Sequence, residues 1–151
     1  MRFVHVNLVA RHLEELALFY QRVFGCAPVP PRRRLSGPWL DAATGIPEAR
    51  IEGVHLRLPG NGGEGPTLEI FQYNPEARAR KPTLNRPGLA HLAFQVEDVT
   101  AARDAVLAGG GSAVGEIVQA EVPGAGTVEF IYARDPEGNL LELQRWSTNA
   151  T

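Results

Sequence analysis

Residues 3–25 read FVHVNLVARHLEELALFYQRVFG, and this stretch predicts the first two elements of the fold. The β-branched and apolar residues of 3–9 favour a strand. Apolar residues then recur every three or four positions, which predicts a helix over 13–24. Gly25 follows where a residue in the left-handed conformation commonly ends a helix. The stretch therefore predicts a strand that leads directly into an amphipathic helix.

The same order of elements occurs a second time further along the chain. In the first half, the helix is followed by strands predicted over 51–58 (IEGVHLRL) and 67–73 (TLEIFQY), which a glycine-rich turn joins. The second half predicts a strand over 89–96, a helix over 99–108 that Asp98 can cap, and strands over 114–122, 127–133 and 139–146. A repeated strand, helix and further strands predict an α+β fold.

The 151 residues are enough for one compact domain, which can consist of two fused half-size modules. We expect a single domain over 1–151, with module one at 1–74 and module two at 88–147. The linker 75–87 is polar and contains three prolines, as a crossover between modules often does. Segment 28–50 is long for a plain loop, so we expect it to contain an edge strand, a short helix or a substrate lid.

Composition excludes several classes of function. Hydrophobic residues make up 44% and charged residues 21%, and the net charge is −2, so nothing indicates binding to nucleic acid or to an anionic membrane. No apolar run approaches the roughly 18 residues of a membrane span. The first residues lack the pattern of a secretory signal, and the single cysteine, Cys26, excludes an internal disulfide framework. We therefore expect a cytoplasmic protein.

Four polar residues are unusual within the apolar strands that are predicted to hold them. Along 67–73, Leu68 and Ile70 share one face and Glu69 points to the other. The other three predicted strands show the same arrangement, so each half has a histidine on its first strand and a glutamate on its last. These residues are His5, Glu69, His91 and Glu142.

This duplicated pattern predicts a metal site. Carboxylates are depleted in strand centres and costly to bury unless they are paired or bind a metal ion. Two neutral imidazoles and two carboxylates neutralise one divalent ion. Mixed nitrogen and oxygen ligands suit Zn²⁺, Ni²⁺, Co²⁺, Mn²⁺ or Fe²⁺, with positions left for water or substrate.

The chain resembles the vicinal-oxygen-chelate superfamily, which includes glyoxalases, bleomycin-resistance proteins and extradiol dioxygenases. The resemblance covers roughly the whole chain and rests on HVNLVARHLEELALFYQRVFG, TLEIFQY, GLAHLAFQVEDV and DPEGNLLELQ. It implies two βαβββ modules that form a curved sheet around a metal-binding cleft. It also implies that His5, Glu69, His91 and Glu142 are the ligands of one divalent ion, because they match the ligand positions on the first and last strands of each module.

The ligand set is similar to that of glyoxalase I, which implies a metal-dependent lyase or isomerase that moves a proton beside a carbonyl. Glu142 or Glu69 would then carry the proton. Segment 28–50 and the linker do not look like glyoxalase I, and His12 stands where the family commonly has an aspartate. The resemblance therefore does not imply specificity for glutathione.

Two alternatives have other functions. An extradiol dioxygenase would use two histidines and one glutamate on Fe²⁺, and Glu69, as a fourth ligand, argues against it. A metal-free protein that sequesters a drug would have lost the ligands, whereas this chain keeps them. We expect a small-molecule substrate and a homodimer, because pairing would cover the exposed sheet edges.

Further residues carry weaker hypotheses. His55 has no counterpart in the second half, so we expect a structural or rim position. Arg32, Arg33 and Arg34 are expected on a loop that borders the cleft, where they would bind an anionic substrate together with Arg78, Arg80 and Lys81 or simply keep the surface soluble. Cys26 follows a helix end, and inert packing is expected for it.

Overall fold

The computed structural model describes residues 1–78 and 82–147 and forms two compact units, Met1–Ala79 and Arg80–Thr151. The division falls within the predicted linker 75–87. Arg80 and Lys81, two of the residues in the anion-binding hypothesis, lie outside the described residues.

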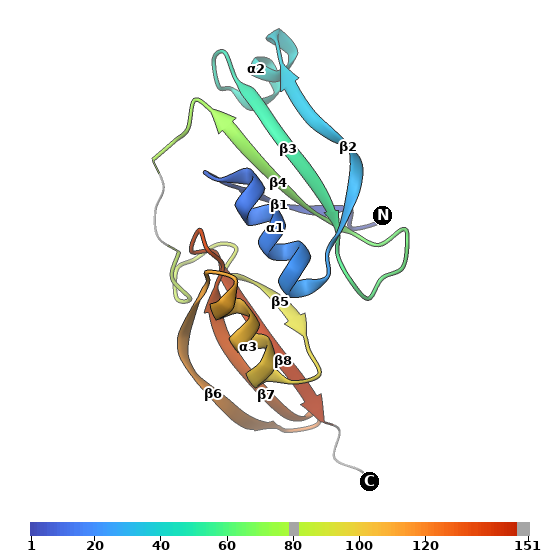
Figure 1. Cartoon of the computed structure of the whole chain (residues 1–151), viewed down its shortest axis with the longest axis vertical. Helices are drawn as coiled ribbons and strands as arrows, with labels where there is room; N and C mark the ends of the chain where they lie inside the picture. Colours follow the sequence, from blue (N-terminus) through green and yellow to red (C-terminus); the bar gives the residue numbers. More distant parts are fainter. Residues whose placement is uncertain (79–81, 148–151) are drawn as a thin grey trace. The chain divides into compact units, whose positions relative to one another are not determined.

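The described residues of the first unit form one four-stranded sheet with two helices, which can be followed in Figure 1. Its strands are ordered β1-β4-β3-β2, with β1 parallel to β4 and the other pairs antiparallel. The elements are β1 (His5–Val9), α1 (Leu13–Phe24), β2 (Ala27–Ser36), α2 (Pro38–Thr44), β3 (Arg50–Arg57) and β4 (Thr67–Asn74).

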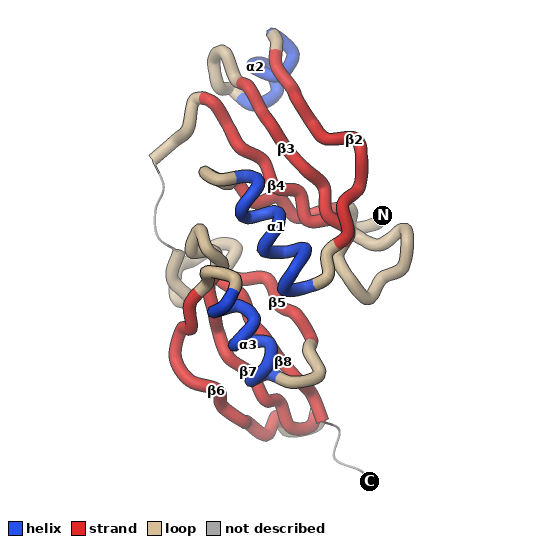
Figure 2. Tube along the Cα trace, viewed as in Figure 1, coloured by secondary structure: helices blue, strands red, loops and turns tan. Residues whose placement is uncertain are grey.

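The second unit repeats this plan, and its described residues, 82–147, contain no counterpart of the second helix (Figure 2). Its sheet has the order β5-β8-β7-β6, again with the first pair parallel and the others antiparallel. The elements are β5 (His91–Gln95), α3 (Val99–Ala108), β6 (Ser112–Val122), β7 (Gly126–Arg134) and β8 (Leu140–Ser147). The predicted α+β fold of two βαβββ modules is confirmed.

The helix ends lie where the sequence predicts them. Gly25 adopts a left-handed φ of 66°, and its backbone N–H donates to carbonyls in the last turn of α1. The Asp98 carboxylate accepts a hydrogen bond of 2.9 Å from the Ala101 backbone N–H and caps α3. Such a cap stabilises a helix by about 1 kcal/mol.

Segment 28–50 contains both an edge strand, β2, and a short helix, α2. Pro38 begins α2, where its missing N–H costs no hydrogen bond. The Asp41 carboxylate accepts hydrogen bonds from the backbone of residues 48 and 49, and Leu40, Ala49 and Ile51 form a small core there. The expectation of a loop at residues 32–34 is therefore wrong, because all three arginines lie in β2. Arg33 and Arg34 pair with β3, and Arg32 lies where the register of β2 shifts.

Each sheet buries one face beneath a helix. In the first unit, α1 packs on β3 and β4, and Leu56, Leu68 and Ile70 are at most 1% exposed. In the second unit, α3 packs on β6, β7 and β8, and Leu141 and Leu143 are fully buried. Since side chains alternate along a strand, the glutamates between these apolar residues point to the opposite face of their sheets.

The first strand is shorter than predicted. It begins at His5, whose register partner Thr67 is the first residue of β4, and Phe3 and Val4 before it are largely exposed. The Thr67 backbone N–H donates a hydrogen bond of 3.0 Å to the Val4 carbonyl oxygen, just before the strand begins. Among the described residues, no helix is long and apolar enough to cross a membrane.

Candidate functional site

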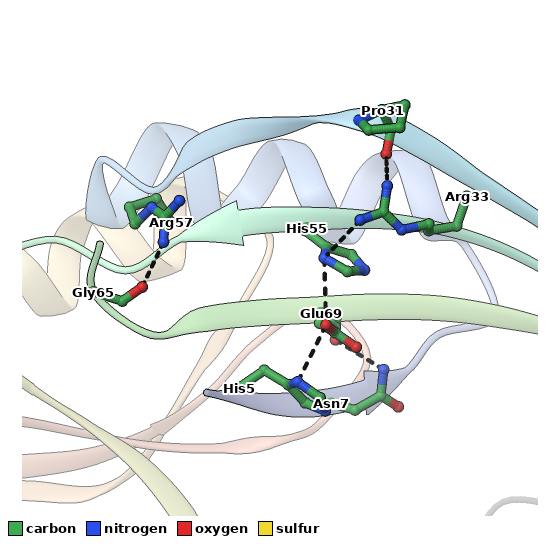
Figure 3. Close-up of polar contacts among 8 residues, drawn as sticks. All are labelled: His5, Asn7, Pro31, Arg33, His55, Arg57, Gly65 and Glu69. Carbon is green, nitrogen blue, oxygen red and sulfur yellow. Dashed lines mark hydrogen bonds and ion pairs between the residues drawn. The ribbon is translucent and has the colours of Figure 1, made fainter. Parts of the chain in front are cut away.

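Glu69 lies at the centre of a polar cluster in the first unit. It stands on β4, between β1 and β3, and both neighbours direct a histidine towards it (Figure 3). His5 Nδ1 and His55 Nδ1 each lie 3.3 Å from the same oxygen, Glu69 Oε1. The Asn7 side chain also donates a hydrogen bond of 3.3 Å to the backbone carbonyl of Glu69. This glutamate is therefore fixed through both its backbone and its carboxylate.

Burial distinguishes the two imidazoles. The His5 side chain is 46% exposed, whereas those of His55 and Glu69 are 15% and 11% exposed. Burial lowers the pKa of His55, and the nearby Arg33 and His5 act in the same direction, while Glu69 opposes them. A neutral His55 imidazole beside the carboxylate follows at physiological pH.

The second unit holds the other predicted pair. His91 Nε2 lies 2.8 Å from Glu142 Oε2, and both side chains are mostly buried. Tyr132 stands opposite Glu142 on β7, and its ring meets the His91 ring edge-on at a centroid distance of 5.3 Å. Burial raises the pKa of Tyr132, and the charge of Glu142 raises it further, so the phenol stays neutral at neutral pH.

The two pairs are equivalent in register. His5 pairs with Thr67 on a parallel strand, two residues before Glu69. His91 pairs with Leu140 in the same way, two residues before Glu142. Residues two apart on a strand share a face, so each histidine reaches the glutamate of its own unit. His5 therefore contacts Glu69 in the first unit, and His91 contacts Glu142 in the second.

The chemistry of these donors fits a divalent ion. Two imidazoles and two carboxylates balance its charge. His91 Nδ1 is a buried nitrogen that has no hydrogen-bond partner in the part of the chain that the structure describes. Within residues 1–78 and 82–147, no group of three or more His, Cys, Asp and Glu side chains has an arrangement that could hold a metal ion. The four-ligand set therefore stays a prediction.

A cavity of about 450 Å³ lies beside Glu69 in the first unit. Four residues of the sheet line it, and Glu64 lines it from the turn between β3 and β4; the sheet residues are His55, Arg57, Thr67 and Glu69. The guanidinium of Arg57 is held there by a hydrogen bond of 2.5 Å to the Gly65 carbonyl. Its volume and polar lining suit a small polar ligand.

The three consecutive arginines do not act together. Arg32 binds Glu14 of α1 and lies 3.9 Å from Glu52, which places it on the helix side of the sheet. Arg33 pairs with Gly53 in register, and its guanidinium nitrogen lies 3.4 Å from His55 Nδ1. The alternation of β2 thus brings only the middle arginine to the face that carries Glu69.

His55 is the residue that the sequence-based interpretation missed. Its expected structural or rim role rested on the lack of a counterpart in the second half. The glycine-rich turn between 51–58 and 67–73 could have predicted the contact, because a hairpin across this turn places His55 opposite Glu69. The structure pairs the two residues in this way. Cys26 is 3% exposed, and burial raises its pKa to about 11, which agrees with the inert packing expected for it.

Comparison with known proteins identifies the family. The model of the glyoxalase/bleomycin resistance protein/dioxygenase superfamily matches residues 2–143. The chain belongs to this superfamily. None of the curated proteins matches it in sequence.

Solved structures of the glyoxalase superfamily share the fold of the chain. A glyoxalase family protein from Bacillus cereus has a TM-score of 0.82 and 23% identity, over 97% of this chain and 94% of that one. A glyoxalase/bleomycin resistance protein/dioxygenase domain from Frankia sp. has a TM-score of 0.63 and 20% identity, over 99% and 95%. A fosfomycin resistance protein from Listeria monocytogenes, complexed with Mn(II) and sulfate, has a TM-score of 0.56 and 16% identity, over 97% and 93%.

Proposed function

We propose that the chain is a metal-dependent lyase or isomerase of the glyoxalase type, which moves a proton next to the carbonyl of a small substrate. The observation that carries this proposal is the matched pair of histidine–glutamate contacts, 3.3 Å for His5–Glu69 and 2.8 Å for His91–Glu142, at equivalent register positions. Both carboxylates of this duplicated arrangement are mostly buried, at 11% and 16% exposure, and such burial is hard to explain by the stability of a sheet alone.

In this proposal, one divalent ion binds to His5, Glu69, His91 and Glu142. The two histidine–glutamate pairs belong either to one chain or to two copies of the chain. Nickel, cobalt, zinc, manganese and iron all suit this donor set. When bound, the ion supplies a positive charge that polarises the substrate carbonyl. That the Listeria monocytogenes protein was solved with Mn(II) supports metal binding within this fold.

We assign the proton transfer to Glu142. Its carboxylate contacts one imidazole, whereas two imidazoles hold the carboxylate of Glu69. The glutamate with fewer contacts has more freedom to swing towards a carbon atom, take its proton and return the proton to the neighbouring carbon. Glu69 then serves mainly as a fixed ligand.

The cavity beside Glu69 supports a small-molecule substrate. About 450 Å³ lies within the range of small-ligand pockets, and Arg2 and Arg57 line the cavity together with two glutamates, Glu64 and Glu69. A carbonyl compound that enters this cavity approaches the Glu69 side of the proposed site. The hydrogen-bond donors that line the cavity would orient the compound.

Metal binding by the purified protein is the decisive experiment. We expect about one divalent ion per chain by elemental analysis after reconstitution with Ni²⁺, Co²⁺, Zn²⁺ or Mn²⁺. Titration calorimetry should show binding that His91→Ala weakens strongly. His12→Ala is the matched control, because His12 is exposed at the start of α1 and outside the ligand set.

Each result has a clear meaning. Binding that is lost in His91→Ala and kept in His12→Ala supports the site, and turnover of α-oxo substrates then supports the chemistry. Binding that both variants keep assigns the metal to other residues. A protein that binds no divalent ion under any condition contradicts the proposal and favours the metal-free drug-binding class.

We also propose that the protein is a homodimer. In the first unit β1 and β2 are edge strands, and in the second unit β5 and β6 are. Unpaired strand edges expose hydrogen-bonding groups that association can cover. Sedimentation equilibrium should give twice the chain mass of 16.4 kDa, and a single-chain mass at micromolar concentration would refute this expectation.

A further inference from the structure

His55 lies on the side of Glu69 that the four-ligand pattern leaves out. The sheet order places β4 between β1 and β3, so His5 and His55 approach the carboxylate from opposite neighbours (Figure 3). Both contacts, at 3.3 Å, go to Oε1. The second oxygen, Oε2, is thereby left for a ligand.

The position of the His55 ring is unfavourable for one of its two nitrogen atoms. Its Nε2 atom is buried and has no hydrogen-bond partner among the described residues. A buried nitrogen without a partner has lost its hydrogen bond to water without a replacement, which destabilises the fold. A ring placed only for packing would not need to bury this nitrogen, so the contact made by Nδ1 is the feature that explains its orientation.

The tautomer follows from the surroundings of the ring. A proton on Nε2 would bury a donor without an acceptor and would turn the lone pair of Nδ1 towards a carboxylate. A proton on Nδ1 instead gives Glu69 a hydrogen-bond donor and avoids that repulsion. Nδ1 then cannot accept from Arg33 Nη2, which lies 3.4 Å away. The other guanidinium nitrogen, Nη1, donates to the Pro31 carbonyl oxygen.

The second unit shows that this contact is not a general requirement of the fold. Tyr132 holds the corresponding register position, opposite Glu142, and no imidazole lies there. A histidine opposite the glutamate therefore belongs to the first unit specifically. The difference makes the two carboxylates unequal.

We propose that His55 is a positioning residue that donates a hydrogen bond from Nδ1 to Glu69 Oε1 and so presents Oε2 to the metal ion. The inference rests on the proposed function. Groups that orient a ligand in this way typically change metal affinity 10–100-fold when they are removed. His55 itself does not bind the metal.

The test compares His55→Leu with His55→Asn by calorimetry with Co²⁺. The asparagine amide nitrogen stands near the place of Nδ1 and keeps the donor, whereas leucine removes it. We expect Co²⁺ affinity to fall about 10–100-fold in His55→Leu and to be largely rescued in His55→Asn. His12→Leu controls for the loss of a histidine, and thermal unfolding shows that each variant is folded. The visible absorption of bound Co²⁺ should match the wild type in His55→Asn, because the ligands are unchanged.

Two results would overturn the inference while the metal site stands. One is wild-type affinity in His55→Leu. The other is equally weak binding in both variants, which would indicate that the ring, not its donor, matters.

A readout without metal separates this inference from the proposed function. Nitrogen NMR of the metal-free protein should show the His55 proton on Nδ1, and Glu69→Leu should change that tautomer. A proton on Nε2 in the wild type would refute the inference. If the wild type binds no metal but shows the expected tautomer, the proposed function fails and the His55–Glu69 contact stands.

Discussion

His55 and Tyr132 occupy the same register position in the two units. Each lies directly opposite the glutamate of the last strand, His55 opposite Glu69 and Tyr132 opposite Glu142. The duplicated fold thus offers two equivalent positions and fills one with an imidazole and the other with a phenol. The proposed division of roles, with Glu69 as a fixed ligand and Glu142 as the proton carrier, rests on this difference.

Ionisation of Tyr132 should report the charge of Glu142. Burial is the larger cause of its raised pKa and the Glu142 charge the smaller. Ultraviolet titration at alkaline pH should therefore show Tyr132 ionising above the ordinary tyrosine value. In Glu142→Gln its pKa should fall but stay above that value, because burial remains. Tyr132→Phe identifies its signal among the three tyrosines. An unchanged pKa in Glu142→Gln would show that the two side chains do not interact.

The fold was predictable from the sequence because its signals are local. The helices over 13–24 and 99–108 match in both bounds, since helical spacing and the residues Gly25 and Asp98 define them. Segment 28–50 carries no such periodicity. Prolines and arginines fill β2, and strand pairing with β3 rather than propensity holds it in place.

The candidate site was predictable only in part. Alternation along single strands was enough to place Glu69 and Glu142 on the face away from the core. The contact of His55 with Glu69 depends on the pairing of two strands, which alternation within one strand does not reveal. The separate paths of Arg32 and Arg33 likewise depend on the register of β2.

Replacement of Glu142 by glutamine should abolish proton transfer and keep the fold. An amide cannot accept the proton, and the loss of a general base typically lowers turnover 10²–10⁴-fold. Turnover and metal content should be measured together. Glu121→Gln, on exposed β6, is the matched control. Full activity with full metal content in Glu142→Gln would transfer the role of the base to Glu69.

Gly53 should be intolerant of even one added carbon atom. A Cβ at this position would overlap the ring of Phe71, which lies across β3 and also stacks near His55. Gly53→Ala should destabilise the fold by about 1–3 kcal/mol through overpacking. Gly63→Ala, where a Cβ meets nothing within 4 Å, should be nearly neutral. Denaturant unfolding measures both variants, and equal stabilities would contradict the packing of Phe71 over Gly53.

An anionic substrate should depend on Arg33 and not on Arg32. Both carry the same charge, but Arg32 is paired with Glu14 and Glu52 on the helix side, and Arg33 lies 3.4 Å from His55 on the side of Glu69. A guanidinium has five N–H donors, so Arg33 retains donors for a carboxylate or phosphate. A hydrogen bond to a charged group contributes roughly 1.5–3 kcal/mol, so Arg33→Leu should raise KM about tenfold or more. The change in kcat should be smaller, because a contact remote from the reacting carbon contributes equally to ground and transition states.

The matched variant Arg32→Leu should leave KM unchanged. Added salt should weaken substrate binding less in Arg33→Leu than in the wild type, because the variant has lost a charge pair that salt would screen. Steady-state kinetics on glutathione hemithioacetals, acyl-CoA thioesters and neutral α-oxo compounds would measure this. Equal effects of the two variants would mean that β2 contributes only general positive charge. If only neutral compounds react and Arg33→Leu leaves KM as it is, the substrate is not an anion held by this strand, and the cavity beside Glu69 selects its ligand by shape and hydrogen bonding instead.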